Sequence, residues 1–276
     1  MARYNLADLH THSFCSDGLR TPAQAVEEAC KAGLQALSLT DHDTVDGIDE
    51  ALEAGEKQGL EIIHGTELSA HIKDREVHIL AYCMEWRDPS LSTYLEQLGR
   101  QRYDRGIAIV ERLNNLGIEL SLEDVLGEAS GSSLGRPHIA AAMVNRGLVA
   151  NKDEAFDRYL GDRSPAFEPK PYMAAGDVID LIHSVKGVAV LAHPGTSLSE
   201  LIISQLVNSG LDGVEVFHPA HQPPQIEYYI QLAGRYDLLQ SGGSDSHGNA
   251  DGSRIGDCGI GYEAIAALRE RAASYA

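Results

Sequence analysis

Two short segments near the N-terminus contain polar side chains of the kinds that bind metal ions. The segment DLHTHSFCSDG places His10 and His12 two residues apart and Asp17 five residues later. The segment TDHD adds His42. Imidazole nitrogens and carboxylate oxygens together suit divalent ions such as Mn²⁺, Fe²⁺ and Zn²⁺. Either segment alone could equally form a turn with local capping bonds, so the prediction depends on the other polar residues.

Five further residues of the same kinds occur farther along the chain: Glu67, His78, His193, Asp245 and His247. Except for His78, each of the nine residues stands at or just after the C-terminal end of a short apolar run that we interpret as a β-strand. In a parallel barrel these strand ends meet on one face, where active sites are built. Such an arrangement of the nine residues is hard to reconcile with chance, and the sequence therefore predicts a multinuclear metal site.

Short apolar strands alternate with amphipathic helices over most of the sequence. Strands are expected at residues 4–10, 36–40, 61–68, 76–82, 187–193, 212–218 and 238–245. A helix is expected at 22–31, with Thr21 as its N-cap and Pro22 in its first turn, and another at 45–58, ending at Gly59. This alternation predicts βα units and a mostly parallel sheet.

The middle of the chain differs from the rest. Residues 91–164 show only helical patterns and end in the proline-rich stretch SPAFEPKPY. We therefore expect a metal-binding barrel built from residues 1–90 and 165–276, interrupted by a helical insertion that covers the strand ends. Within the insertion, Arg136 and His138 stand at a predicted helix N-terminus, an arrangement that suits phosphate binding. Arg136 could equally be an ordinary solvated charge.

The composition limits the classes of function. The chain has 276 residues, a formal net charge of −19 and a pI of about 4.9, so its surface should repel polyanions such as duplex nucleic acid. No stretch approaches the roughly 18 apolar residues of a membrane helix, and the first residues lack the apolar core of a signal peptide. The four cysteines are scattered, as is typical of reduced thiols. We expect a cytoplasmic protein without membrane contact.

The ordered motifs resemble those of one known family. They are DLHTHSFCSDG, LTDHDT, GTELS, EVHILAY, GRPHIA, VLAHPG, GVEVFHPAH and GGSDSHG. Together they resemble the PHP (polymerase and histidinol phosphatase) family, over about residues 6–248. The chain looks most like its stand-alone phosphoesterases, which include nucleoside 3′,5′-bisphosphate phosphatases and 5′→3′ exoribonucleases. The resemblance implies an α/β fold: a distorted (β/α)7 TIM-like barrel with an inserted small helical subdomain.

The resemblance also implies three divalent metal ions, with Mn²⁺ favoured and Fe²⁺ or Zn²⁺ as alternatives. The first ion would be held by His10, His12, Glu67 and Asp245. Glu67 would bridge to a second ion, completed by His78 and His193. The third would be held by Asp17, His42 and His247. Of these ligands, the expected catalytic residues are Asp17, His42, His193 and His247.

Other residues are expected to act around the metals. By the same resemblance, the contacts to substrate phosphate would be Arg136, His138 and His221. Asp41 would orient its neighbour His42. The sequence departs from the family pattern at Ser246, Phe167 and His218, none of which is a metal ligand, so these departures concern the fit of the substrate.

The expected reaction is hydrolysis of phosphate monoesters of small nucleotides by a metal-activated hydroxide. The 3′-phosphate of nucleoside 3′,5′-bisphosphates such as pAp is the expected target, with short 5′-phosphorylated single strands degraded 5′→3′ as a second activity. The metals would attract a small AMP-like or pAp-like anion to an otherwise acidic protein. The alternatives are a histidinol-phosphate-type phosphatase, a non-catalytic metal-binding regulatory module and an amidohydrolase. The oligomeric state stays open.

Overall fold

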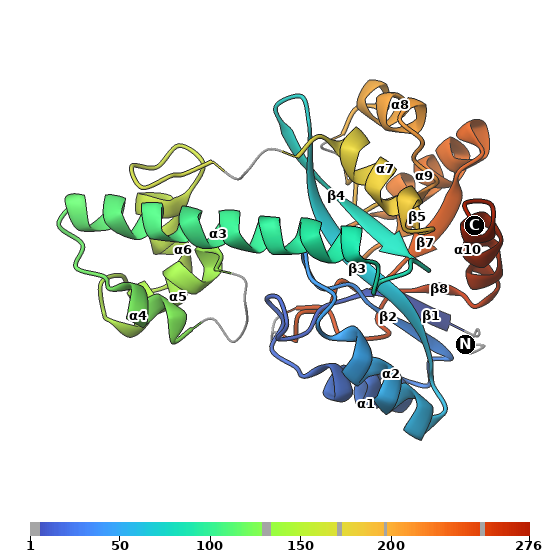
Figure 1. Cartoon of the computed structure of the whole chain (residues 1–276), viewed down its shortest axis with the longest axis horizontal. Coiled ribbons are helices and arrows are strands. Elements are labelled where there is room, and N and C mark those ends of the chain that lie inside the picture. Colours follow the sequence, from blue (N-terminus) through green and yellow to red (C-terminus); the bar gives the residue numbers. More distant parts are fainter. Residues whose placement is uncertain (1–5, 129–133, 170–172, 196–197, 249–251) are drawn as a thin grey trace. The chain divides into compact units, whose positions relative to one another are not determined.

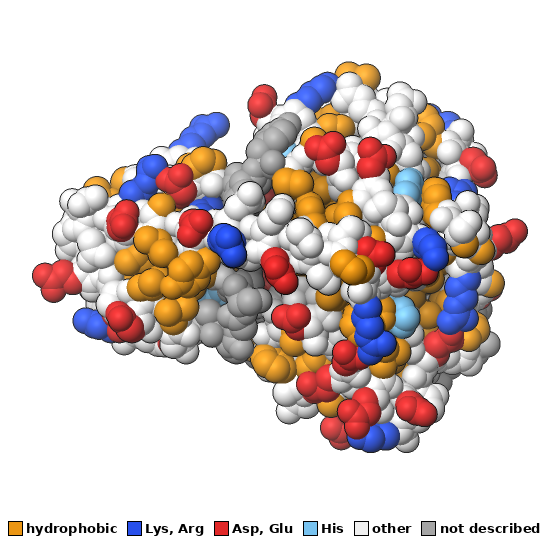
Figure 2. Space-filling model, in the orientation of Figure 1, with side chains coloured by type: hydrophobic (Ala, Val, Ile, Leu, Met, Phe, Trp, Pro, Cys, Tyr) orange, Lys and Arg blue, Asp and Glu red, His pale blue; other side chains and the backbone are white. Residues whose placement is uncertain are grey.

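Two parts of the chain fold as separate units in the computed structural model, which describes residues 6–128, 134–169, 173–195, 198–248 and 252–276 (Figure 1). The barrel unit consists of residues 1–92 and 172–276, and the helical unit of residues 93–171. Figure 2 shows acidic side chains spread over the visible face, as the net charge of −19 requires. None of the helices in the described residues combines the length and the apolar character needed to cross a membrane.

The barrel unit contains one eight-stranded sheet, in the order β7-β6-β5-β4-β3-β2-β1-β8. Its strands are β1 (Leu6–Thr11), β2 (Ala36–Leu39), β3 (Glu61–Ile72), β4 (Arg75–Tyr82), β5 (Val188–Leu191), β6 (Gly213–Phe217), β7 (Leu239–Gly242) and β8 (Ile260–Gly261). Strands β1 to β3 are parallel to one another, as are β5 to β7. The predicted parallel sheet is therefore right for these two groups.

Strand β4 runs against both of its neighbours, β3 and β5, and the short β8 runs against β1. Strands β3 and β4 form a hairpin whose turn consists of Lys73 and Asp74, with Lys73 at φ +55°. A two-residue turn cannot make the crossover that parallel strands need. The hairpin also lengthens β3 to Ile72, so Glu67 lies inside the strand and does not end it as the sequence suggested.

The sheet curves until its seventh strand meets its first. The backbone N–H of Asp245 donates to the carbonyl of His10 over 2.8 Å, and Thr11 and Ser246 form a parallel bridge. Gly243 allows this approach, because a Cβ atom there would lie 2.3 Å from the nitrogen of His10. The nearly closed sheet confirms the predicted α/β barrel.

Helices of the barrel unit cover the outside of the sheet (Figure 1). They are α1 (Pro22–Ala32), α2 (Ile48–Gln58), α7 (Ala175–Ser184), α8 (Glu200–Asn208), α9 (Pro223–Tyr236) and α10 (Glu263–Ala273). The predicted N-cap of α1 is confirmed, because Thr21 Oγ1 accepts from the backbone N–H of Gln24. Helix α2 begins at Ile48, three residues later than expected, and ends before Gly59 at φ +70°.

Apolar side chains fill the barrel and the layer between sheet and helices. Leu9, Leu80 and Val190 are fully buried in the barrel core, and Leu268 of α10 packs against the same cluster. A second cluster joins α1 and α2 to β2. Close packing of this kind holds strand ends in fixed positions, which a multinuclear site requires.

The helical unit has a core of its own. Helix α3 (Pro89–Asn115) starts in the barrel unit and continues into the helical unit, where it is followed by α4 (Leu122–Leu126), α5 (Arg136–Asn145), α6 (Lys152–Ala155) and the π-helix η1 (Phe156–Leu160). Leu113, Ile139 and Met143 are fully buried together. The described residues 93–128 and 134–169 contain only helices and loops, in agreement with the helical pattern of this part of the sequence.

Candidate metal centre

The barrel brings all nine predicted metal-binding residues together. Four overlapping groups each offer ligand atoms within 4.8 Å of one another: His12, Asp17, His42 and His247; His10, His12 and Glu67; His10, His193 and Asp245; His42, Glu67 and His78. Residues from β1, β3 and β4 and from the segments after β1, β2, β5 and β7 take part. The antiparallel β4 contributes through its beginning, because its start lies at the same end of the barrel as the carboxyl ends of the parallel strands.

Glu67 lies at the centre of the cluster and is 1% exposed. Its Oε1 atom lies 2.8 Å from His78 Nδ1 and 2.9 Å from His193 Nε2. Its Oε2 atom lies 3.2 Å from His10 Nε2 and 3.3 Å from His12 Nε2, and also 3.2 Å from His42 Nδ1. Each carboxylate oxygen thus faces a different set of imidazoles, the arrangement that a bridging ligand needs.

Some ring nitrogens in this cluster make no well-directed hydrogen bond among the described residues, although carboxylate oxygens lie 3.1 to 3.3 Å from two of them. They are Nδ1 and Nε2 of His12 and Nδ1 of His42, all buried. An unsatisfied buried polar atom costs about 1–3 kcal/mol, so each such atom requires an explanation. A cation between the rings and the carboxylates would accept these lone pairs. The donor set, imidazole with carboxylate, therefore fits divalent metal ions.

The metal-free cluster holds protons at neutral pH. Burial alone lowers the pKa of His10, but the carboxylates of Glu215 and Glu67 outweigh burial and raise it well above its usual value. Against the same effect of burial, the close carboxylates of Asp245 and Glu67 raise the pKa of His12 to about 10. Because a ligating imidazole must be unprotonated, metal ions compete with these protons.

His42 and the carboxylates shift in the opposite direction. Burial, together with the positive charge of His12, lowers the pKa of His42 to about 3. Burial favours the neutral form of Asp17, yet the hydrogen bond with His247 and the charges of nearby rings lower its pKa. Asp17 and His42 are therefore already in the ionisation states that metal binding requires.

Two buried acids of the site were missed by the sequence analysis. Glu215 in β6 is fully buried, with Oε1 3.0 Å from His10 Nδ1, and Oε2 accepts from the backbone N–H of His193 over 2.7 Å. Asp8 in β1 accepts from the backbone N–H of Ser244, and burial raises its pKa to about 6. The available signal for Glu215 was a single acid inside an otherwise apolar strand, and for Asp8 it was an acid between two apolar residues directly before His10.

Asp41 contacts a different part of the site from the one expected. Its Oδ1 atom accepts from the backbone N–H of Ser13 over 2.7 Å and from Ser16 Oγ over 2.6 Å, and its Oδ2 atom accepts from Ser13 Oγ. These bonds fix the turn that leads to Asp17. The carboxylate of Asp41 therefore orients the loop of Asp17, whereas the sequence suggested the ring of His42.

Two further histidines lie beside the cluster. His218 is 9% exposed, and its Nε2 atom lies 3.2 Å from Asp245 Oδ2. His221, a predicted phosphate contact, donates from Nδ1 to the carbonyl of Val216 over 2.9 Å and accepts at Nε2 from the backbone N–H of Gly195 over 3.1 Å. Both ring nitrogens of His221 thus have partners within the protein, and a phosphate contact would have to replace one of them.

The other predicted phosphate contacts lie in the helical unit. Arg136 opens α5, and its Nη1 atom donates to the carbonyl of Leu160 over 3.0 Å and to Asp162 Oδ1 over 2.7 Å. The Nδ1 atom of His138 accepts from the backbone N–H of Gly135 over 3.1 Å. Both side chains are thereby held at the N-terminus of α5, where backbone N–H groups favour anions.

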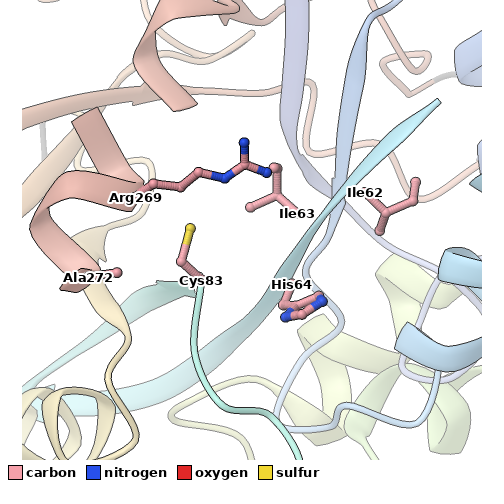
Figure 3. A pocket seen from close by; sticks show the side chains of 6 residues that line it. All are labelled: Ile62, Ile63, His64, Cys83, Arg269 and Ala272. Carbon is pink, nitrogen blue, oxygen red and sulfur yellow. The ribbon is translucent and has the colours of Figure 1, made fainter. Parts of the chain in front are cut away.

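A cavity at the other end of the barrel strands offers no comparable set of ligands (Figure 3). Its volume is about 300 Å³, and its described lining residues are Ile62, Ile63, His64, Cys83, Arg269 and Ala272. Burial raises the pKa of the Cys83 thiol to about 11, which disfavours the thiolate that would bind a metal. The metal centre at the carboxyl ends of the parallel strands is therefore the candidate functional site.

Comparison with known proteins agrees with this assignment. A family model for the PHP domain matches residues 8–159, which are 152 of the 276 residues. A 5′-3′ exoribonuclease of Haemophilus influenzae is 33% identical over 246 residues, which cover 87% of this chain and 89% of the relative. A phosphoribosyl 1,2-cyclic phosphate 1,2-diphosphodiesterase of Eggerthella lenta is 34% identical over 88% of this chain and 94% of its own.

Another relative and a solved structure complete the comparison. A 3′,5′-nucleoside bisphosphate phosphatase of Chromobacterium violaceum is 29% identical over 90% of this chain and 89% of its own. The crystal structure of a protein from Bifidobacterium adolescentis, assigned as a metal-dependent phosphoesterase, superimposes with a TM-score of 0.88, 34% identity and 96% coverage of both chains. The chain belongs to the PHP domain family and is a metal-dependent hydrolase of phosphoric esters.

Proposed function

We propose that this enzyme removes the 3′-phosphate from nucleoside 3′,5′-bisphosphates such as pAp and degrades short 5′-phosphorylated oligonucleotides 5′→3′. The observation that carries the proposal is the convergence of five imidazoles on the two oxygens of Glu67. The names of the relatives from Chromobacterium violaceum and Haemophilus influenzae support a nucleotide substrate.

The ligand sets of the proposal follow from these contacts. We assign one ion to His10, His12, Glu67 and Asp245, a second to Glu67, His78 and His193, and a third to Asp17, His42 and His247. Divalent ions, with Mn²⁺ as our choice, supply an activated water and neutralise charge on the phosphate when bound. Glu67 presents Oε1 to the rings of the second set and Oε2 to those of the first set, and Oε2 also lies 3.2 Å from His42 of the third set. Glu215 keeps the proton of His10 on Nδ1, which leaves Nε2 available to an ion.

The charge of the protein favours a small substrate. A net charge of −19 repels long polyanions, so attraction of an anion depends on cations held at the metal centre. In the helical unit, we assign Arg136 and His138 to phosphate binding, because a guanidinium and a helix N-terminus both favour phosphate oxygens. These groups suit a nucleotide with two phosphates better than a duplex.

A second candidate reaction is hydrolysis of a phosphoribosyl cyclic phosphate. The observation in its favour is the 34% identity with the Eggerthella lenta diphosphodiesterase over 94% of that relative. The same ligand set would serve both reactions, since each is attack of water at phosphorus. The two candidates differ in the organic group that the site must accept.

A substrate panel tests the proposal. Phosphate release would be measured from pAp, from histidinol phosphate and from the cyclic phosphate, with protein loaded with Mn²⁺ and with the His193→Ala variant as control. Release from pAp that is fast and depends on His193 is the expected result. If another compound is hydrolysed and pAp is not, the substrate must be reassigned. If the metal-loaded protein releases phosphate from none of the three compounds, the proposal is wrong.

A further inference from the structure

A cavity of about 300 Å³ lies directly against the metal centre. Its described lining residues are Glu76, Val77, His78, Ala192, His193, Pro194 and Leu198. His78 and His193 also contact Glu67 Oε1, at 2.8 and 2.9 Å, so they belong to both the cavity and the cluster. A group in this cavity would therefore lie next to the proposed ligands of the second metal ion.

The cavity forms where β4 begins and β5 ends. These strands are antiparallel neighbours, and the backbone N–H of Ala192 donates to the carbonyl of His78 over 3.0 Å. Val77 is 5% exposed and Ala192 2% exposed, so this wall is formed by well-packed residues. This wall of the cavity is consequently part of the packed barrel.

The lining is unsuited to phosphate. Glu76 is its only carboxylate, and none of the described lining residues is Lys or Arg. A phosphate dianion would be repelled by Glu76 and would meet no Lys or Arg among the described lining residues, whereas an uncharged ring would gain from contact with the apolar walls. A volume at the lower end of the range of ligand pockets accommodates a single ring system.

We propose that this cavity binds the nucleobase of the substrate, so that the enzyme selects nucleotides among phosphate esters. This inference rests on the proposed function. Oε1 of Glu76 lies 3.3 Å from His78 Nε2, and a carboxylate has further lone pairs that can accept from the amino group of adenine or cytosine. Leu198 contributes the apolar contact that can be removed without touching a proposed metal ligand.

The test compares substrates that differ only in the base. They are 2′-deoxyadenosine 3′,5′-bisphosphate and 1,2-dideoxyribose 3,5-bisphosphate, a stable tetrahydrofuran analogue that has hydrogen in place of the base. The Leu198→Ala variant is compared with Leu201→Ala, a control leucine in α8 that is 64% exposed and does not line the cavity. We expect the wild type to prefer the base-bearing compound by about 10-fold in kcat/KM, a contribution typical of one apolar contact surface.

Leu198→Ala should lose most of this preference through a higher KM for the base-bearing compound, with unchanged turnover of the abasic one. Leu201→Ala should behave as the wild type. Equal turnover of both compounds by the wild type, or a preference that survives in Leu198→Ala, would overturn the nucleobase site and leave the phosphatase function standing.

An equilibrium measurement separates the two proposals when turnover fails. Binding of AMP to the metal-loaded protein, followed by calorimetry, requires no catalysis. If neither bisphosphate is hydrolysed, the proposed function is wrong. In that case, weaker AMP binding by Leu198→Ala than by Leu201→Ala would still support the cavity as a nucleobase site, and equal binding by the two variants would overturn it.

Discussion

Glu215 and His10 are both fully buried and face one another, with Oε1 3.0 Å from Nδ1. A carboxylate can only accept, so Nδ1 of His10 keeps its proton when the ring is neutral. Nε2, 3.2 Å from Glu67, is then the atom that can bind a cation once its own proton has left. The other oxygen of Glu215 accepts from the backbone N–H of His193, which has the unusual φ of +23°. One side chain therefore orients two proposed metal ligands, one in β1 and one in the segment after β5.

Replacement of Glu215 by glutamine should reverse the protonation pattern of His10. If the amide NH₂ faces Nδ1, that nitrogen becomes the acceptor, and the proton moves to Nε2, where it blocks a metal ion. We expect metal affinity or activity to fall about 10- to 100-fold, as is typical for partners of metal-binding histidines. Metal-binding calorimetry would measure the loss, with Glu53→Gln, at a position 69% exposed, as control. Unchanged affinity would show that Glu215 does not set the tautomer.

Loss of a proposed ligand should remove both metal and activity. His193→Ala or Asp245→Ala should reduce phosphate release to background and lower the metal content measured by elemental analysis. The matched control is His183→Ala, because His183 lies outside the cluster with Nε2 2.8 Å from Asp212 Oδ2. That variant should retain its metal while losing about 1–3 kcal/mol of stability. Full metal content in both ligand variants would contradict the proposed sets.

Metal binding should release protons and weaken as the pH falls. The pKa of His12 is raised from 6.5 to about 10 without metal, so a cation must displace its proton at neutral pH. The raised pKa of His12 also contributes to the folding stability of the metal-free protein. This contribution is complete below pH 6.5 and is lost as the pH rises towards 10. Calorimetry in two buffers of different ionisation enthalpy would count the protons. A binding enthalpy that is independent of the buffer would argue against this competition.

Gly243 should tolerate no side chain. A Cβ atom there would lie 2.3 Å from the nitrogen of His10, so Gly243→Ala must push β7 away from β1. We expect a loss of about 1–3 kcal/mol in the free energy of unfolding, with reduced metal affinity. Gly234→Ala is the control, since that position has nothing within 4 Å, and alanine should there stabilise the helix by about 0.5–1 kcal/mol. Thermal unfolding of both variants would measure these changes. Similar unfolding midpoints for Gly243→Ala and Gly234→Ala would contradict the predicted clash at Gly243.

Arg136→Ala should mainly raise KM for pAp, or lower kcat if the guanidinium contacts phosphate only in the transition state. The control is Arg158→Ala, because Arg158 is 54% exposed and forms an i,i+4 ion pair with Glu154. Asp162→Asn weakens the ion pair that holds Arg136 and should shift KM in the same assay. Wild-type kinetics in Arg136→Ala would remove this residue from the substrate site.

Local patterns made much of the barrel predictable. Apolar runs predicted the position of the seven longer strands, and the capping pattern of Thr21 and the glycine at 59 predicted where two helices begin or end. These features depend on residues that are close together in the chain, so they can be predicted from the sequence alone. The same holds for most of the nine His, Asp and Glu residues, because the ends of parallel strands in one barrel meet; Glu67 and His78 lie inside β3 and β4 instead.

Contacts between residues far apart in the chain decided the strand direction and the side-chain partners that the sequence did not predict. The direction of β4 follows from its pairing with β3 and β5, and this pairing places Glu67 inside a strand with five imidazoles around it. Glu215 and His10 are 205 positions apart, and no local pattern connects them. The sequence by itself determined the kinds of side chain proposed as ligands and most of the elements that carry them. Only the tertiary structure decided which buried acid orients which ring, because a buried carboxylate is stable only where folding supplies its donors.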